Sequence, residues 1–181
     1  MQKVAKYVIF PTKWGHFGLA GTESALCRTC LPGPRSGRIK SQLLKNLSAA
    51  QFDKTFFKDV QEQVAAYFEG ARIDFSLDIP VLLDGFSTFG RSVLTTCRKI
   101  KPGRTASYGA LAKKIDRPAA SRAVGSTLAK NPLPLIIPCH RVLRTDGNLG
   151  GFSAPGGIVL KERMLELEHQ ALSSAKMPNY V

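Results

Sequence analysis

Hydrophobic periodicity changes partway along this chain of 181 residues, and that change constrains the fold more than any other feature. Three early stretches alternate or run apolar between Gly and Pro residues, as in a short antiparallel meander: Lys3–Phe10, Trp14–Gly21 and Ala25–Leu31. Helical spacing follows over Ile39–Leu47 and Thr55–Phe68, and Ile73–Leu77 alternates as a further strand. Residues 1–85 are therefore predicted to form an N-terminal α/β domain, in which helices cover an antiparallel sheet and Pro80–Gly85 is the linker.

The remainder, residues 86–181, predicts a mainly α C-terminal domain built from short helices. Phe89–Ile100 has helical character and is closed by Pro102-Gly103, and Ser107–Ile115 follows as a second helix. Asp116-Arg117-Pro118 predicts a turn, with Pro118 at the first position of a helix that runs through about Ala129. Two short helices across a tight turn make a helix-turn-helix, although such hairpins often serve packing alone. An amphipathic helix over Ile158–Gln170 completes the domain.

The formal net charge of +13 predicts an acidic partner, with nucleic acid ahead of a membrane surface. Residues 86–144 hold 12 Lys and Arg residues against a single acid, Asp116, whereas residues 1–85 hold 11 against 8. In the second helix of the predicted helix-turn-helix, Arg122 stands among small residues: Ala119, Ala120, Ser121 and Ala123. Small residues let a backbone approach a groove closely while one cation reaches in, so this helix is a candidate DNA-binding element.

Cys139 and His140 place a potential nucleophile beside a base, within the stretch Pro138–Val142. The thiolate attacks and the thiol does not, so a working cysteine needs a lowered pKa or a partner that removes its proton. If the segment is extended, adjacent side chains point to opposite faces, which favours contact through a bridging water or across a bend. A buried apolar cysteine beside a chance histidine is the alternative that this pair alone leaves open.

The other cysteines indicate neither a disulfide framework nor a metal site. The four cysteines are not spaced like a small secreted scaffold, and Cys27-x-x-Cys30 has no second Cys or His pair at zinc-finger spacing. We expect no metal and no other cofactor. The apolar run Tyr7–Phe10 is too short for a signal segment, and no stretch approaches a membrane span. The chain is predicted to be soluble and intracellular, cytoplasmic near the nucleoid in a prokaryote or nuclear in a eukaryote.

Residues from about Phe89 to Glu168 closely resemble the O6-alkylguanine-DNA alkyltransferases in the order and spacing of their motifs. Those motifs are Arg122–Gly125, Asn131–Val142, Gly150–Ser153, Lys161-Glu162 and Leu167-Glu168. Over residues 1–85 the resemblance rests mainly on position, and there it implies a ribonuclease-H-like fold. The family resemblance implies direct reversal of DNA damage, in which the alkyl group of O6-alkylguanine passes irreversibly to the protein, with O4-alkylthymine as a further candidate substrate.

The resemblance also implies the chemical roles. Cys139 matches the alkyl acceptor, His140 the base that activates it through water, and Glu168 the carboxylate that orients the imidazole. Without the resemblance, Glu162, Glu166 and Glu168 cannot be told apart. Asn131 matches a hinge asparagine that ties the DNA-binding helix to the cysteine segment, whereas the residues alone fit an Asn-Pro helix stop equally well.

For DNA, the resemblance implies a monomer that enters the minor groove of the duplex and flips the damaged nucleotide out of the stack. Arg122 matches the finger that fills the gap, and Tyr108 the residue that rotates the phosphate and bonds the base edge; a half-buried helix tyrosine is its plainer interpretation. Further expected DNA contacts are Ala120, Ser121 and Arg141. The alkylguanine pocket is expected to comprise Tyr108, Cys139, Val142 and Ser153.

Three other functions are weighed against this one. A sensor that binds lesions without repairing them would lack the cysteine, a regulator that uses alkylation of Cys139 as a signal would carry an effector domain, and a cysteine peptidase or acyltransferase would not explain the basic segment.

Two departures from the family pattern concern the pocket. Phe152 stands where a tyrosine often occurs, and Ala154-Pro155 lengthens and stiffens the loop after Ser153.

Overall fold

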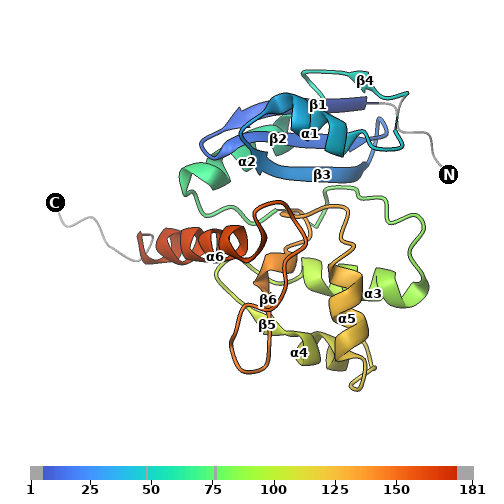
Figure 1. Cartoon of the computed structure of the whole chain (residues 1–181), viewed down its shortest axis with the longest axis vertical. Coiled ribbons are helices and arrows are strands. Elements are labelled where there is room, and N and C mark those ends of the chain that lie inside the picture. The colour runs from blue at the N-terminus through green and yellow to red at the C-terminus, as the bar shows by residue number, and fades with distance from the viewer. Residues whose placement is uncertain (1–5, 48, 76, 175–181) are drawn as a thin grey trace.

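The computed structural model describes residues 6–47, 49–75 and 77–174, which form a sheet half above a helical half (Figure 1). The sheet order is β3-β2-β1-β4. The strands β1 (Lys6–Thr12), β2 (Gly15–Gly21) and β3 (Leu26–Gly33) make the predicted antiparallel meander. A two-residue β4 (Gln51–Phe52) adds a parallel edge beside β1. The meander prediction is thus confirmed from Lys6 onward, while residues 3–5 lie outside the described residues.

Two helices cover opposite faces of this sheet, because side chains alternate along each strand. The helix α1 (Ser36–Leu43) packs Ile39 and Leu43 against Tyr7. On the other face, α2 (Lys58–Glu69) packs against Val8 and Phe17. As predicted, α2 stops at Gly70, which adopts the left-handed conformation with φ 100°. The N-terminal part is therefore an α/β unit with one helix on each side of the sheet (Figure 1).

Among the described residues, four α-helices build the lower half: α3 (Thr88–Arg98), α4 (Tyr108–Lys114), α5 (Ser121–Leu128) and α6 (Gly157–Ser174). Ser87 caps α3 by accepting a hydrogen bond from the Gly90 amide, and Ser107 caps α4 by accepting one from the Ala110 amide. The predicted helices are confirmed with shifts of a few residues at their ends. The fold is an α/β domain followed by a helical domain.

The predicted strand Ile73–Leu77 is wrong for its described residues, which have irregular backbone, and Ser76 lies outside the description. The segment of residues 80–82 pairs with the outer edge of β3. The Leu26 amide donates to the Pro80 carbonyl, and the Leu82 amide donates to the Leu26 carbonyl. Since this segment satisfies the backbone groups of β3, Pro80–Gly85 is in part a bridge to the sheet and not a free linker.

The predicted start of α5 at Pro118 is also corrected. The Ala120 amide donates to the Arg117 carbonyl, so Pro118 occupies the second position of a tight turn, where its fixed φ is favourable. Asp116 before it is left-handed with φ 58°. The helix itself begins at Ser121.

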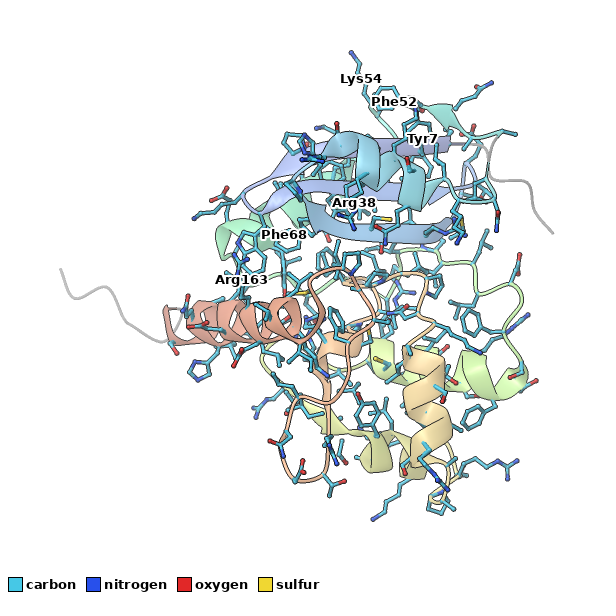
Figure 2. The ribbon with its side chains drawn as sticks, in the orientation of Figure 1. Tyr7, Arg38, Phe52, Lys54, Phe68 and Arg163 are labelled. Carbon is cyan, nitrogen blue, oxygen red and sulfur yellow. The ribbon has the colours of Figure 1, made fainter. Side chains whose placement is uncertain are left out.

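The buried core is continuous between the halves, as Phe68 of α2 and Met164 of α6 belong to one cluster. Phe68 and Arg163 lie on either side of the boundary (Figure 2). Near them the Arg163 guanidinium lies 4.2 Å from the centre of the Trp14 ring, a cation–π contact. Thr29 of β3 binds the proline-rich segment, because its hydroxyl donates to the Pro134 carbonyl at 2.7 Å. No helix among the described residues is long and apolar enough to cross a membrane.

Candidate active site

A two-residue parallel ladder positions the cysteine beside Tyr108. The strand β5 (Ala106–Ser107) pairs with β6 (Val142–Leu143). Tyr108 directly follows β5, and the 3₁₀ turn η1 (Cys139–Arg141) directly precedes β6. The segment at Cys139 is therefore a tight bend, and not the extended chain considered from the sequence. In this bend His140 and Arg141 enter the interior while Cys139 is half-buried.

Cys139 is hydrogen-bonded by Asn131. The Asn131 amide nitrogen donates to Sγ at 3.2 Å and to the Ile137 carbonyl at 2.8 Å, and its oxygen accepts from the Leu133 amide. Burial raises the pKa of the Cys139 thiol, and the Asn131 hydrogen bond and the Lys161 charge offset this only in part. The resting group is therefore a thiol, and its reaction requires a base. Asn131 does more than tie turns together, because it contacts the sulfur itself.

His140 is fully buried, with Nε2 2.8 Å from Oε1 of Glu168. Burial lowers the pKa of the His140 imidazole, and this effect outweighs the opposing influence of Glu168. The ring is therefore neutral at rest. Since an ionised carboxylate only accepts hydrogen bonds, Nε2 must carry the proton and Nδ1 the lone pair. Nδ1 is buried and has no hydrogen-bond partner among the described residues.

Glu168 is only 4% exposed and is surrounded by donors. Arg141 donates to both carboxylate oxygens, at 2.8 to 3.1 Å, and the Gly103 amide donates to Oε2 at 3.0 Å. Burial alone would raise the pKa of the Glu168 carboxyl, but the hydrogen bonds of His140 and Arg141 and the charge of Arg141 lower it well below its usual range. Glu162 and Glu166 are exposed, so burial singles out the carboxylate that the sequence alone did not.

A cavity of about 370 Å³ opens over Cys139. It is lined by Tyr108, Gly125, Leu128, Ala129, Cys139, Gly151, Phe152 and Ser153. Gly150, next to the lining residue Gly151, lies close to Tyr108: a Cβ atom there would lie 2.9 Å from the Tyr108 hydroxyl, and its φ of 67° favours glycine. The Ser153 hydroxyl donates to the Ala129 carbonyl at 2.7 Å and joins the loop to the end of α5. The site thus holds a half-buried thiol at the wall of a small, partly apolar cavity.

A second cavity, of about 570 Å³, is more open and also reaches Tyr108. Ser121 and the exposed Arg122 line it from α5, and Arg144 lines it from the loop after β6. Ala120, at the start of α5, is half-buried and is not part of this lining. The structure therefore brings Tyr108, Ser121 and Arg122 together beside the cysteine cavity.

Two expected contacts are placed differently from the prediction. Arg141 was expected to contact DNA, but it is 3% exposed and its guanidinium binds Glu168 and the Ile100 carbonyl. A side chain committed to a buried ion pair does not reach a phosphate, so that expectation is wrong. Val142 is fully buried and does not line the cysteine cavity, and its carbonyl accepts a hydrogen bond from Lys161.

With this geometry established, known proteins identify the family. Residues 88–170 match the model of the 6-O-methylguanine DNA methyltransferase, DNA binding domain. A methylated-DNA–protein-cysteine methyltransferase of Methanosarcina acetivorans is 34% identical over 163 residues, which cover 90% of this chain and 97% of that protein. The chain belongs to the methylated-DNA–protein-cysteine methyltransferase family. Another such methyltransferase, from Methanocaldococcus vulcanius, is 44% identical over 115 residues, 64% of this chain and 62% of that protein.

Solved structures agree with this methyltransferase assignment. The crystal structure of Mycobacterium tuberculosis OGT in complex with DNA superposes with a TM-score of 0.76 at 32% identity, and covers 92% of this chain and 94% of that one. A second structure, of the Mycobacterium tuberculosis O6-methylguanine methyltransferase, gives a TM-score of 0.74 at 31% identity, with 96% and 95% covered. The likeness therefore extends through the sheet half, where the sequence resemblance rested mainly on position.

Lys161 is a site residue of this methyltransferase to which the sequence gave no role. It is 1% exposed, and its ammonium donates to the Val142 carbonyl at 2.6 Å and also to the Leu149 carbonyl. Burial lowers the pKa of the Lys161 ammonium. The available signal was its place beside the apolar run Ile158–Leu160, where a lysine on the buried helix face needs a partner.

The Cys27-x-x-Cys30 pair is not part of a cluster of potential ligands. Cys27 is half-buried and Cys30 is buried, and burial raises the pKa of both thiols, that of Cys30 to about 11. Across the described ranges, no three His, Cys, Asp or Glu side chains gather in a way that would hold a metal ion.

Proposed function

We propose that this protein repairs O6-alkylguanine in duplex DNA by moving the alkyl group onto Sγ of Cys139, once per molecule, with O4-alkylthymine as a further substrate. The observation that carries the proposal is the arrangement at Cys139. A thiol hydrogen-bonded by Asn131 faces a cavity, and the next residue along the chain is a neutral His140 held by Glu168. Membership of the methyltransferase family supports the same reaction.

The reaction that we propose balances without a cofactor. His140 Nδ1, through one water, takes the thiol proton, and the resulting imidazolium is stabilised by the ionised Glu168. The thiolate attacks the alkyl carbon in line, so that an S–C bond forms while the C–O6 bond breaks. The guanine leaves as an anion and takes up one proton. The product on Cys139 is a thioether, which water does not readily cleave, so each chain acts once.

For DNA binding, α4, the turn at Asp116–Pro118 and α5 are proposed to act as a helix-turn-helix whose second helix enters the minor groove. Arg122 is the proposed finger that fills the stack, with Ala120 and Ser121 against the backbone and Tyr108 at the flipped nucleotide. The cavity that joins Tyr108, Ser121 and Arg122 supports this assignment, as does the solved relative that contains DNA. The minor groove offers a degenerate code, which suits an enzyme that scans for damage.

The two-part architecture supports a division of the chain into a structural domain, residues 1–85, and a DNA-binding and alkyl-acceptor domain, residues 86–181. The sheet half, with three antiparallel strands and a helix on each face, is proposed to be ribonuclease-H-like. We propose that the protein acts as a monomer on DNA.

A titration of methylated duplex against protein tests the reaction. The methyl groups removed should reach a plateau at one per wild-type chain and not rise with time. Cys139→Ala should remove none while binding the duplex with nearly unchanged affinity, because the groove contacts lie on other residues. Continued turnover by the wild type would instead favour a hydrolase, and transfer by Cys139→Ala would contradict the assignment of the acceptor.

A salt titration tests the DNA interface independently of the chemistry. Binding to undamaged duplex should weaken steeply as salt rises, since neutralised phosphates release counterions, and it should depend little on sequence. A nearly flat response of the dissociation constant to salt would contradict the nucleic-acid assignment.

A further inference from the structure

We propose that Tyr67, in the sheet half, is a positioning residue for His140 and that it acts through Glu168. The inference rests on the proposed role of His140 as the base at Cys139. It gives the N-terminal half a part in the chemistry beyond supporting its neighbour. The matched family region begins at residue 88, so it does not include Tyr67.

The contact joins two segments far apart in the sequence. The Tyr67 hydroxyl lies 2.9 Å from Oε1 of Glu168, the same oxygen that lies 2.8 Å from His140 Nε2. Tyr67 is on the last turn of α2 and is 1% exposed. In Figure 1 α2 ends just above α6, the helix that carries Glu168. The sheet half therefore reaches the carboxylate that binds the catalytic base.

Tyr67 is the donor in this bond. Burial and the neighbouring Glu168 raise the pKa of the Tyr67 hydroxyl, so it keeps its proton, and the ionised carboxylate only accepts. The ring packs against Phe68, with centroids 5.0 Å apart, and against Phe75, with centroids 6.0 Å apart. A ring fixed in this way holds its hydroxyl in one place, which is what a positioning role requires.

The hydroxyl and the imidazole compete for one oxygen. A hydrogen bond from Tyr67 withdraws negative charge from Oε1, and so weakens the pull of Glu168 on an imidazolium proton. This keeps His140 neutral, with the lone pair of Nδ1 available. Removal of the hydroxyl leaves Arg141 and the Gly103 amide to hold the carboxylate in place. The expected result is a more basic His140 in an otherwise intact site.

Other charged and titratable groups also face His140, and they stay the same in this comparison. Glu168 and Lys161 approach from α6, and Arg141 approaches from η1. Cys97 of α3 adjoins this group, and burial keeps its thiol protonated by raising its pKa. Because none of these changes when the Tyr67 hydroxyl is removed, a change in the titration of His140 reports on Tyr67.

The test is Tyr67→Phe, with Tyr7→Phe as the matched control, since Tyr7 is a buried tyrosine of the sheet on the face away from α2. The rate of the chemical step is measured on methylated duplex with saturating protein over a series of pH values, which separates it from DNA binding. The rate falls on the acid side as His140 becomes protonated. In Tyr67→Phe that acid limb should move to higher pH by about half a pH unit, while the plateau at high pH stays within a few-fold. Tyr7→Phe should match the wild type.

The ¹⁵N resonances of the His140 ring, followed by NMR across the same pH range, give a second readout that does not depend on activity. They should titrate at higher pH in Tyr67→Phe than in the wild type. A purely structural tyrosine would lower the melting temperature and leave both the acid limb and the resonances unmoved, and that result would overturn the inference. If the wild type transfers no methyl group, the proposed function fails, whereas the NMR titration still decides the role of Tyr67.

Discussion

Charged side chains are buried and paired on one side of the Cys139 turn and exposed on the other side. On the inner side, His140, Arg141 and Glu168 are each less than 5% exposed, and the Arg141 guanidinium and the ionised Glu168 carboxylate pair at hydrogen-bond distance. On the outer side, Arg122 and Arg144 are exposed around an open cavity. The charged groups of the inner side are paired within the protein, whereas the exposed arginines of the outer side are available to a binding partner.

This difference fits the roles that we propose for the two sides. A base that works by a lowered pKa requires burial, and a buried charge is tolerated only when it is paired and hydrogen-bonded. Recognition of phosphates requires cations that are still free to exchange water and counterions for DNA. Arg141 and Arg122 are the same residue type with different proposed roles: the buried Arg141 pairs with Glu168, whereas the exposed Arg122 is proposed to fill the gap left by the flipped base.

The largest expected effect belongs to the inner side. Glu168→Gln leaves the Arg141 guanidinium buried without its counter-charge, so the free energy of unfolding should fall by about 3–5 kcal/mol. Glu166→Gln, two residues away on the exposed face of the same helix, is the matched control and should change it by less than about 0.5 kcal/mol. Urea denaturation of the two variants at neutral pH makes the measurement. If Glu168→Gln and Glu166→Gln lowered the free energy of unfolding equally, the proposed difference between buried and exposed charges would be contradicted.

The next effect belongs to the outer side. Arg122→Ala should slow repair of methylated duplex by roughly tenfold, because the energy that offsets unstacking is lost. Reaction with free O6-benzylguanine, which needs no extrusion, should stay within about twofold of the wild type, and so should stability, because exposed substitutions perturb folding little. Arg72→Ala, an exposed arginine in the sheet half, is the control. If both substrates lose equally, Arg122 supports the pocket or the fold instead.

The smallest effect concerns the loop between the two sides. Ser153 lines the cysteine cavity, and Ala154 and Pro155 line an adjoining cavity of about 280 Å³ that also reaches Cys139. A proline restricts its own φ and the residue before it, so this wall should resist moving aside for a bulky group. We expect the wild type to favour methyl over benzyl lesions and Pro155→Gly to shift the ratio by a few-fold.

Competing methyl- and benzylguanine oligonucleotides give that ratio directly as relative second-order rates. Ala154→Gly, which loosens the loop without removing the proline ring, is the companion variant and should change the ratio less. A ratio unchanged by Pro155→Gly would mean that the loop does not set the size of the alkyl group.

Much of the fold could be predicted from hydrophobic periodicity and from the positions of Gly and Pro residues. The meander, the helix stop at Gly70 and the helices α3, α4 and α6 follow from local patterns. The failures have non-local causes. Ile73–Leu77 was expected to be a strand, but it is Val81 that bridges to Leu26 of β3, and backbone pairing between distant segments leaves little trace in the sequence. Pro118 fits both a helix start and a turn, and the bond from Ala120 to Arg117 decides for the turn.

The candidate site could be predicted where its residues are neighbours in the sequence or match the family motifs. It could not be predicted where tertiary contacts bring distant residues together. Cys139 and His140 are adjacent, and the family resemblance supplied Glu168. Neither pattern nor resemblance placed Tyr67 at the carboxylate, 101 positions away along the chain. Arg141 was misassigned because a basic residue in a basic segment fits a phosphate contact, and only its burial beside Glu168 shows otherwise.

The mass of the intact protein after incubation with excess methylated duplex, followed by peptide mapping, tests the central claim most directly. The account predicts one added methyl group per wild-type chain, located on Cys139, and none on Cys139→Ala. Methylation of Cys27, Cys30 or Cys97 in place of Cys139, or a mass that stays unmodified while methyl groups leave the DNA, would contradict it.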